Sequence, residues 1–225
     1  MMRTLCLTRA LVDKIPGSIP DPGPVAEIAE YQTDEVQAET LHAVLQTRPD
    51  HDAFWIFAFG SLMWNPITTF EEQRRAHVKG WHRAFCLGPD TRYRGNPSCP
   101  GLMLSLDHGG ACEGVAFRLD ETGLPEHLKD LITREPPIPP VWVEAETAEG
   151  PIYALAFVCI PDGMGYVGDL SPEETARQIA PAVGMFGSMA DYVLNTATHL
   201  EEMGIHDKTV WRMQSLVAAE LEKLP

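Results

Sequence analysis

The chain has 225 residues and is 44% hydrophobic, which predicts one domain with its own core, with or without an appendage. Its 32 acidic and 17 basic residues give a net charge of −15, which argues against nucleic acid and anionic membranes as partners. Five scattered cysteines without a C-x-x-C pair fit reduced thiols rather than a disulfide framework or a zinc site. No signal peptide or membrane-spanning run is visible, so we expect a cytoplasmic protein.

The N-terminal region is rich in proline and glycine. Four prolines lie between residues 16 and 24, so residues 1–33 are expected to form an extended arm. Apolar residues at helical spacing then predict an amphipathic helix over residues 34–47. We therefore expect residues 1–51 to form an arm with one helix, and residues 52–225 to form the main domain.

Short β-rich segments separated by Gly, Pro or Asp follow. Strands are expected over residues 54–59, 78–87, 101–106, 114–119, 141–146 and 152–160, with one helix over residues 124–134 among them. A capping box at Ser171, with proline at the first helical position, begins a helical region. Two more helices are expected over residues 189–203 and 208–224. Strands first and helices afterwards predict an α+β fold.

Common catalytic motifs are missing from the sequence: there is no G-x-S-x-G, no Walker loop and no H-E-x-x-H, and the histidines do not pair at metal-ligand spacing. Residues 163–168 match G-x-G-x-x-G. The next helix begins only at Ser171-Pro172, however, so we interpret this stretch as a glycine loop and not a dinucleotide site. A second Phe-Gly-Ser sequence at residues 186–188 is interpreted as coincidence.

Two local features suggest a ligand site. In "FWIFAFGSLMWNP", residues 54–66, an apolar strand breaks at Gly60-Ser61, where backbone amides could approach a ligand closely. Glu135 ends the one helix expected among the strands, and the following proline favours an extended conformation for it. It is either a catalytic carboxylate or a carboxylate on a solvated helix end, and its position alone favours the second interpretation.

A family resemblance joins these features. The blocks "FAFGSLMWNP", "HVKGWHRAFCLG", "RYRGNPSCPGLMLSLDHGGACEGVAFRL", "ITREP", "YVGDLSPEETARQIA" and "ADYVLNTATHLEEMGI" appear in order. Over roughly residues 54–220 the chain resembles the ChaC-type γ-glutamylcyclotransferases. The resemblance implies an α+β fold with a small mixed β-barrel and surrounding helices. The arm and helix before residue 52 lie outside it.

The resemblance also implies a reaction. These enzymes cleave a γ-glutamyl amide, typically in glutathione, to give 5-oxoproline and the freed amine, here Cys-Gly. The substrate's own α-amine attacks its γ-carbonyl, and intramolecular attack has a large effective molarity once the substrate is held folded. No catalytic serine, cysteine, metal or cofactor is implied. The implied partner is a small γ-glutamyl molecule, with neither nucleic acid nor membrane involved.

Site residues follow from the matching motifs. Glu135 matches the family's catalytic glutamate, which takes the amine proton and returns one to the leaving nitrogen. The segment from Phe59 through Gly60, Ser61, Leu62 and Met63 would meet the glutamyl head of the substrate. Two further candidates lie later in the chain. Arg94 is favoured over Arg92 to pair with a substrate carboxylate. Tyr192 either lines the site or packs a helix against the core.

Two departures from the family pattern keep alternatives open. The family's tyrosine before Gly-Ser is Phe59 here, which keeps the ring and loses the hydroxyl. After Glu135 the family usually continues through a Gly-Tyr segment, whereas this chain has "PPIPP". One alternative is therefore a cyclotransferase for other γ-glutamyl amines. Another is a catalytically silent relative that binds a metabolite or a partner protein.

Overall fold

The computed structural model describes residues 3–25, 32–49, 53–161, 163–168 and 170–225. The chain forms two compact units, and each is assembled from separate stretches of sequence. The barrel unit comprises Ala26–His82 and Leu106–Ile160, and the helical unit comprises Met1–Val25, Arg83–Ser105 and Pro161–Pro225. The predicted boundary at residue 52 stays a prediction, because residues 50–52 lie outside the described residues.

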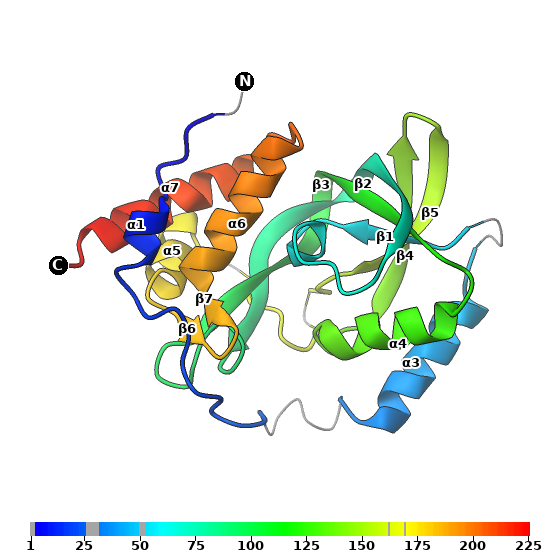
Figure 1. The fold of residues 1–225 in the computed structure, drawn as a ribbon, viewed down its shortest axis with the longest axis horizontal. Coiled ribbons are helices and arrows are strands. Elements are labelled where there is room, and N and C mark those ends of the chain that lie inside the picture. Colours follow the sequence, from blue (N-terminus) through cyan, green and yellow to red (C-terminus); the bar gives the residue numbers. More distant parts are fainter. Residues whose placement is uncertain (1–2, 26–31, 50–52, 162, 169) are drawn as a thin grey trace. The chain divides into compact units, whose positions relative to one another are not determined.

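A closed five-stranded barrel is the centre of the fold (Figure 1). Its strands, in spatial order, are β1 (Trp55–Ala58), β3 (Gly101–Leu119), β2 (Phe70–Asp90), β4 (Pro140–Thr147) and β5 (Gly150–Phe157). β1 pairs antiparallel with β3 and parallel with β5, so the barrel is mixed. All four residues of β1 are buried, which explains its continuous apolar sequence. The predicted α+β fold with a small mixed barrel is confirmed.

Two strands differ from the sequence prediction. β2 begins at Phe70 instead of residue 78, and the two strands expected at residues 101–106 and 114–119 are one strand, β3. Pairing between β2 and β3 explains both results: Phe70 stacks on Phe117 with ring centres 4.2 Å apart, and Arg118 pairs with Glu71 at 3.3 Å. Such cross-strand pairs stabilise a strand whose residues have low β-propensity.

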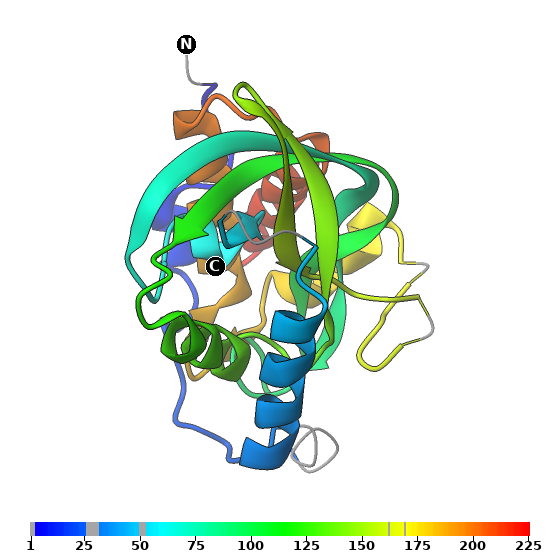
Figure 2. The ribbon, with the colours of Figure 1, turned by 90° about the vertical axis from the view of Figure 1, so that its right-hand side faces the viewer.

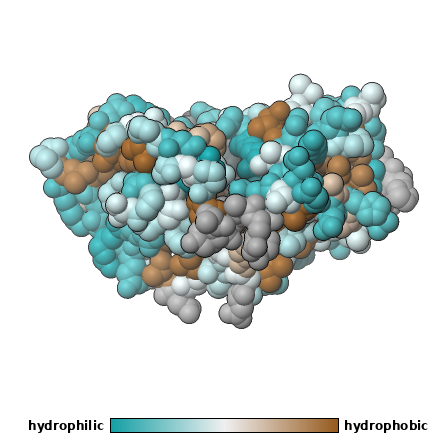
Figure 3. Space-filling view, turned by 90° about the horizontal axis from the view of Figure 1, so that it is seen from below, coloured by the Kyte–Doolittle hydropathy of each residue, from teal (hydrophilic) through white to brown (hydrophobic). Residues whose placement is uncertain are grey.

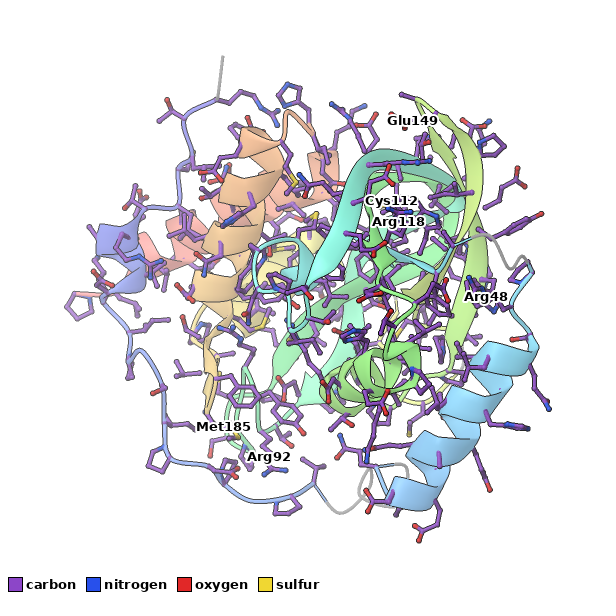
Figure 4. All side chains as sticks on the ribbon, turned by 45° about the vertical axis from the view of Figure 1, so that its right-hand side comes forward. Arg48, Arg92, Cys112, Arg118, Glu149 and Met185 are labelled. Atoms are coloured by element: carbon purple, nitrogen blue, oxygen red, sulfur yellow. The ribbon has the colours of Figure 1, made fainter. Side chains whose placement is uncertain are left out.

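Two helices belong to the barrel unit. The predicted helix near the N-terminus is α3 (Asp34–Gln46), and it packs against α4 (Leu124–Arg134), as Figures 1 and 2 show. The end of α3 is held to the barrel unit by side chains. Thr47 accepts a hydrogen bond from the Trp142 indole at 3.2 Å, and Arg48 pairs with Glu121 at 2.7 Å (Figure 4).

The helical unit contains α1 (Arg9–Val12), α5 (Pro172–Ile179), α6 (Met189–Glu202), α7 (Lys208–Glu222) and a hairpin of β6 (Val183–Gly184) and β7 (Gly187–Ser188). The predicted capping box is present, since Ser171 and Glu174 exchange side-chain to backbone hydrogen bonds. The predicted extended arm contains α1, a short helix capped by Thr8. Residues 163–168 form a loop that bridges to β2 through Tyr166, and no helix opens within it.

The surface carries the charge that the composition predicts. On the face drawn in Figure 3, hydrophilic residues cover most of the surface and apolar residues form separate small patches. Within the described part of the chain, no helix is both long enough and apolar enough to cross a membrane.

Candidate active site

The break after β1 is a single 3-10 turn. Phe59 is half-buried against the barrel core, with its ring centre 6.4 Å from that of Phe57. The turn η1 (Ser61–Met63) then begins, and the Met63 amide donates to the Gly60 carbonyl at 3.0 Å. Leu62 and Met63 are buried and anchor the turn, and no side chain caps its N-terminal amides. These amides are therefore backbone donors of the kind that the sequence analysis expects here.

Arg134, which the sequence analysis did not identify, connects this turn to α4. Its guanidinium donates to the Ser61 hydroxyl at 3.2 Å and to the backbone carbonyl of Asn65. Thr68 adds a second connection through a hydrogen bond of 2.9 Å to His127 on the same helix. The only sequence signal for Arg134 is its place beside Glu135 in "ITREP". These contacts bring the Gly60–Met63 turn and the end of α4 together.

Glu135 is the residue that ends α4. Its backbone is extended, with φ −70° and ψ 155°, which confirms the expected effect of the following proline. Its side chain is 16% exposed, and its carboxylate lies 3.8 Å from the Arg134 guanidinium. Burial raises the pKa of Glu135 to about 7, while the positive charge of Arg134 acts in the opposite direction. At neutral pH such a carboxyl group can both accept and return a proton.

Arg94 and Tyr192 lie together in the helical unit. The Arg94 guanidinium donates to the Ser188 carbonyl at 3.3 Å and lies 5.7 Å from the centre of the Tyr192 ring. The Arg94 side chain is 13% exposed, and burial lowers its pKa from the usual value. Tyr192 is buried, so it packs α6 into the core and also supports Arg94. The two interpretations of Tyr192 are thus compatible.

The loop that carries Arg94 is folded around Asp90. The Asp90 carboxylate accepts hydrogen bonds from the backbone amides of Arg92, Tyr93 and Arg94, at 2.6–3.0 Å. The same loop contacts the β6–β7 hairpin, where the Met185 amide donates to the Arg92 carbonyl at 2.9 Å; Figure 4 shows these two residues side by side. Asp90 therefore determines where the Arg94 backbone lies.

The second Phe-Gly-Ser sequence is part of this arrangement. A Cβ at Gly187 would lie 2.8 Å from the Arg94 guanidinium, and the φ of +118° at Gly187 disfavours other residues. Ser188 accepts a hydrogen bond from the Asp191 amide and so caps α6. The interpretation of residues 186–188 as coincidence missed this local role, because the sequence does not show that the hairpin contacts Arg94.

The predicted site residues thus form two groups, each within one compact unit. Phe59–Met63 and Glu135 belong to the barrel unit, and Arg94 and Tyr192 belong to the helical unit. Their predicted roles remain predictions. Across the described ranges, no group of three or more His, Cys, Asp or Glu side chains is arranged to hold a metal ion.

Comparison with known proteins places the chain in a family. A glutathione-specific γ-glutamylcyclotransferase of Escherichia coli K12 is 38% identical over 177 residues, which cover 77% of this chain and 76% of that protein. The glutathione-specific γ-glutamylcyclotransferase 1 of Rattus norvegicus is 34% identical over 69% of this chain and 73% of its own length.

Structure comparison adds evidence for the fold. The crystal structure of a yeast γ-glutamyl cyclotransferase specific to glutathione matches with a TM-score of 0.67, over 76% of this chain and 97% of that one. At 19% identity this match shows a shared fold. The family model of the ChaC-like proteins matches residues 54–220, which include both groups of candidate site residues. On this evidence the chain belongs to the ChaC-like protein family.

Proposed function

We propose that the chain is a γ-glutamylcyclotransferase that converts glutathione to 5-oxoproline and Cys-Gly. The α-amine nitrogen of the substrate forms a bond to its own γ-carbonyl carbon, and the bond from that carbon to the cysteine nitrogen breaks. The proton that leaves the amine is returned to the departing nitrogen, so the reaction needs no external nucleophile. The activity named for the relatives supports this proposal.

Glu135 is the single observation that carries the proposal. A free α-amine has a pKa of about 8 and is mostly protonated at neutral pH, so it must lose a proton before it attacks. A carboxyl group with a pKa of about 7 is well matched to that transfer. Arg134 holds the Gly60–Met63 turn next to the helix end that bears Glu135.

The remaining candidates are assigned to binding. Backbone amides of the Gly60–Met63 turn would stabilise the oxygen of the attacked carbonyl, because fixed donors favour developing negative charge. Arg94 would bind a substrate carboxylate, with Tyr192 beneath its guanidinium. The scattered free cysteines support action in the cytoplasm, where thiols stay reduced.

The first experiment measures product. Purified protein is incubated with glutathione, and 5-oxoproline and Cys-Gly are quantified. We expect both products in equal amounts, and we expect Glu135→Gln to lose at least about a hundredfold in kcat because it removes only the proton acceptor. Glu126→Gln, on the exposed first turn of the same helix, is the matched control and should keep wild-type turnover. Wild-type turnover in Glu135→Gln would exclude Glu135 as the base.

A cyclotransferase for other γ-glutamyl amines is the second candidate, and it is favoured by Phe59 and by the segment after Glu135. Phe59 packs among apolar core residues, and Ile138 anchors "PPIPP" by its burial. A panel of γ-glutamyl dipeptides separates the two candidates: a higher kcat/KM with another amine would make glutathione a secondary substrate. Binding of glutathione without any 5-oxoproline, from any substrate of the panel, would indicate a silent relative instead.

A further inference from the structure

The N-terminal residues 3–25, named here the N-terminal strap, lie outside the family match at residues 54–220 but are attached along the helical unit. The Gln214 side chain accepts hydrogen bonds from the amides of Cys6 and Leu7, both at 2.9 Å, and Leu7 is 1% exposed. Further along, Asp21 forms a two-bond ion pair with Arg92 at 2.7 and 2.8 Å. The strap is therefore fixed at both of its ends.

Between these ends the strap supplies a cation to the surroundings of Arg94. Arg9 donates to Asp191 Oδ1 at 2.7 Å, while the other oxygen, Oδ2, accepts from the Asn195 amide group at 3.0 Å. Arg94 is the more distant cation, since its Nη1 lies 3.7 Å from Oδ2, beyond hydrogen-bond range. Asp191 is thus held by Arg9 and Asn195, and not by Arg94.

This arrangement leaves the Arg94 charge available. Within the described ranges, the Ser188 carbonyl is the one acceptor within 3.5 Å of the Arg94 guanidinium, and it is neutral. A largely buried guanidinium without a close anionic partner favours a carboxylate, which can accept two parallel hydrogen bonds from it. If Asp191 rotated by about 1 Å toward Arg94, it would occupy that role itself.

We propose that Arg9 is a positioning residue that keeps Asp191 away from Arg94, so that Arg94 can bind a carboxylate of the γ-glutamyl substrate. This inference rests on the proposed function, in which Arg94 is the carboxylate-binding residue. Arg9 itself is 55% exposed, and ion pairs of this kind contribute little to stability. Its replacement should therefore change binding without unfolding the protein.

The test compares Arg9→Gln with Arg9→Lys, which keeps the charge. For Arg9→Gln we expect KM for glutathione to rise about five- to tenfold with kcat within about twofold, because Asp191 then competes for Arg94. Arg9→Lys should restore most of the affinity. Arg212→Gln, which removes another exposed arginine of the same unit from its pair with Glu173, is the control and should change neither constant.

Two further measurements separate positioning from a structural effect. Adding Asp191→Asn to Arg9→Gln should return KM toward the wild-type value, because a neutral amide does not compete for Arg94. Glutathione diethyl ester, which lacks both carboxylates, should bind wild type and Arg9→Gln equally. Binding is measured by calorimetry in the Glu135→Gln background, where the substrate persists.

The outcomes distinguish this inference from the proposed function. Release of 5-oxoproline with an unchanged KM in Arg9→Gln would overturn the role of Arg9 alone, as would a failure of Asp191→Asn to rescue it. Glutathione binding that weakens in Arg9→Gln, in a chain that releases no 5-oxoproline, would support the role of Arg9 and overturn the proposed function. No binding of glutathione to the wild-type chain would overturn both.

Discussion

Glu135 has two influences on its pKa that act in opposite directions: burial favours the neutral acid, and the charge of Arg134 favours the carboxylate. Burial is the larger of the two, so the pKa rises from the usual value to about 7. The base form of Glu135 is therefore gained as the pH rises through neutrality. A carboxyl group on a solvated helix end would already be ionised at pH 5.

The pH dependence of kcat/KM tests this directly. We expect kcat/KM for glutathione to rise about tenfold per pH unit below pH 7 and to level off above it, because only ionised Glu135 accepts the proton. Initial rates of 5-oxoproline release between pH 5 and 8.5 give the profile. A profile that is flat down to about pH 5 would contradict a base with this pKa.

Phe59 is the residue where the chain departs from the family motif. Its ring already packs against the barrel core near Phe57, so Phe59→Tyr adds only a hydroxyl. If a polar partner faces that position in the substrate complex, we expect kcat/KM on glutathione to rise about fivefold, the value of one hydrogen bond of about 1 kcal/mol. Steady-state kinetics and a thermal melt are measured together. Loss of both stability and activity would mean that the surroundings of Phe59 are apolar, and would favour a substrate other than glutathione.

At the scale of elements, the important connection is between η1 and α4. A 3-10 turn of three residues has little stability of its own, because its hydrogen bonds are few. Arg134 supplies what the turn lacks, through bonds to Ser61 and Asn65, and the same guanidinium lies beside Glu135. One side chain therefore affects both the position of the turn and the acidity of the carboxyl group.

Substitutions of Arg134 separate these two effects. Arg134→Gln should move the acidic limb of the pH profile to higher pH, because removal of the positive charge raises the pKa of Glu135 further. It should also raise KM, because the turn loses its connection to α4. Arg134→Lys keeps the charge without the paired hydrogen bonds, so we expect a near-normal limb with a raised KM. An unchanged limb in Arg134→Gln would show that the two charges do not interact.

At the scale of the whole molecule, the chain's two ends are joined within the helical unit by an ion pair. Arg3 donates to the Glu201 carboxylate at 3.0 Å and lies over the Trp211 ring at 3.7 Å. Hydrogen bonds from Arg3 lower the pKa of Glu201 to about 2, and the Glu201 side chain is 3% exposed. A lowered carboxyl pKa stabilises the folded state above the unfolded pKa of about 4.5.

Acid unfolding tests this contribution. Glu201→Gln should lower the free energy of unfolding at pH 7, and its difference from wild type should shrink as the pH falls from about 4.5 through about 2. Urea titrations of both proteins at pH 7, 4 and 3 give the comparison. If the two compact units unfold separately, only the transition of the helical unit should shift. A difference that stays constant with pH would show that the loss came from packing and not from the ionised pair.

The sequence by itself determined most of the elements, because the signals that define them lie between near neighbours. The cap at Ser171 acts on residue 174, Pro136 sets the backbone of Glu135, and β1 is recognisable by its unbroken apolar run. The ordered motifs that carry the family resemblance are likewise visible in the sequence alone, and they indicated the family that the comparisons then confirmed.

Only the tertiary structure decided the features that depend on residues far apart in the chain. The early start of β2 and the continuity of β3 come from cross-strand pairs such as Phe70 with Phe117, which no local propensity contains. Arg134 reaches Ser61 across 73 residues, and Arg9 reaches Asp191 across 182. The pKa of Glu135 is likewise a property of its burial. Charges, desolvation and hydrogen bonds act through space, so the fold must bring these groups together before their chemistry is defined.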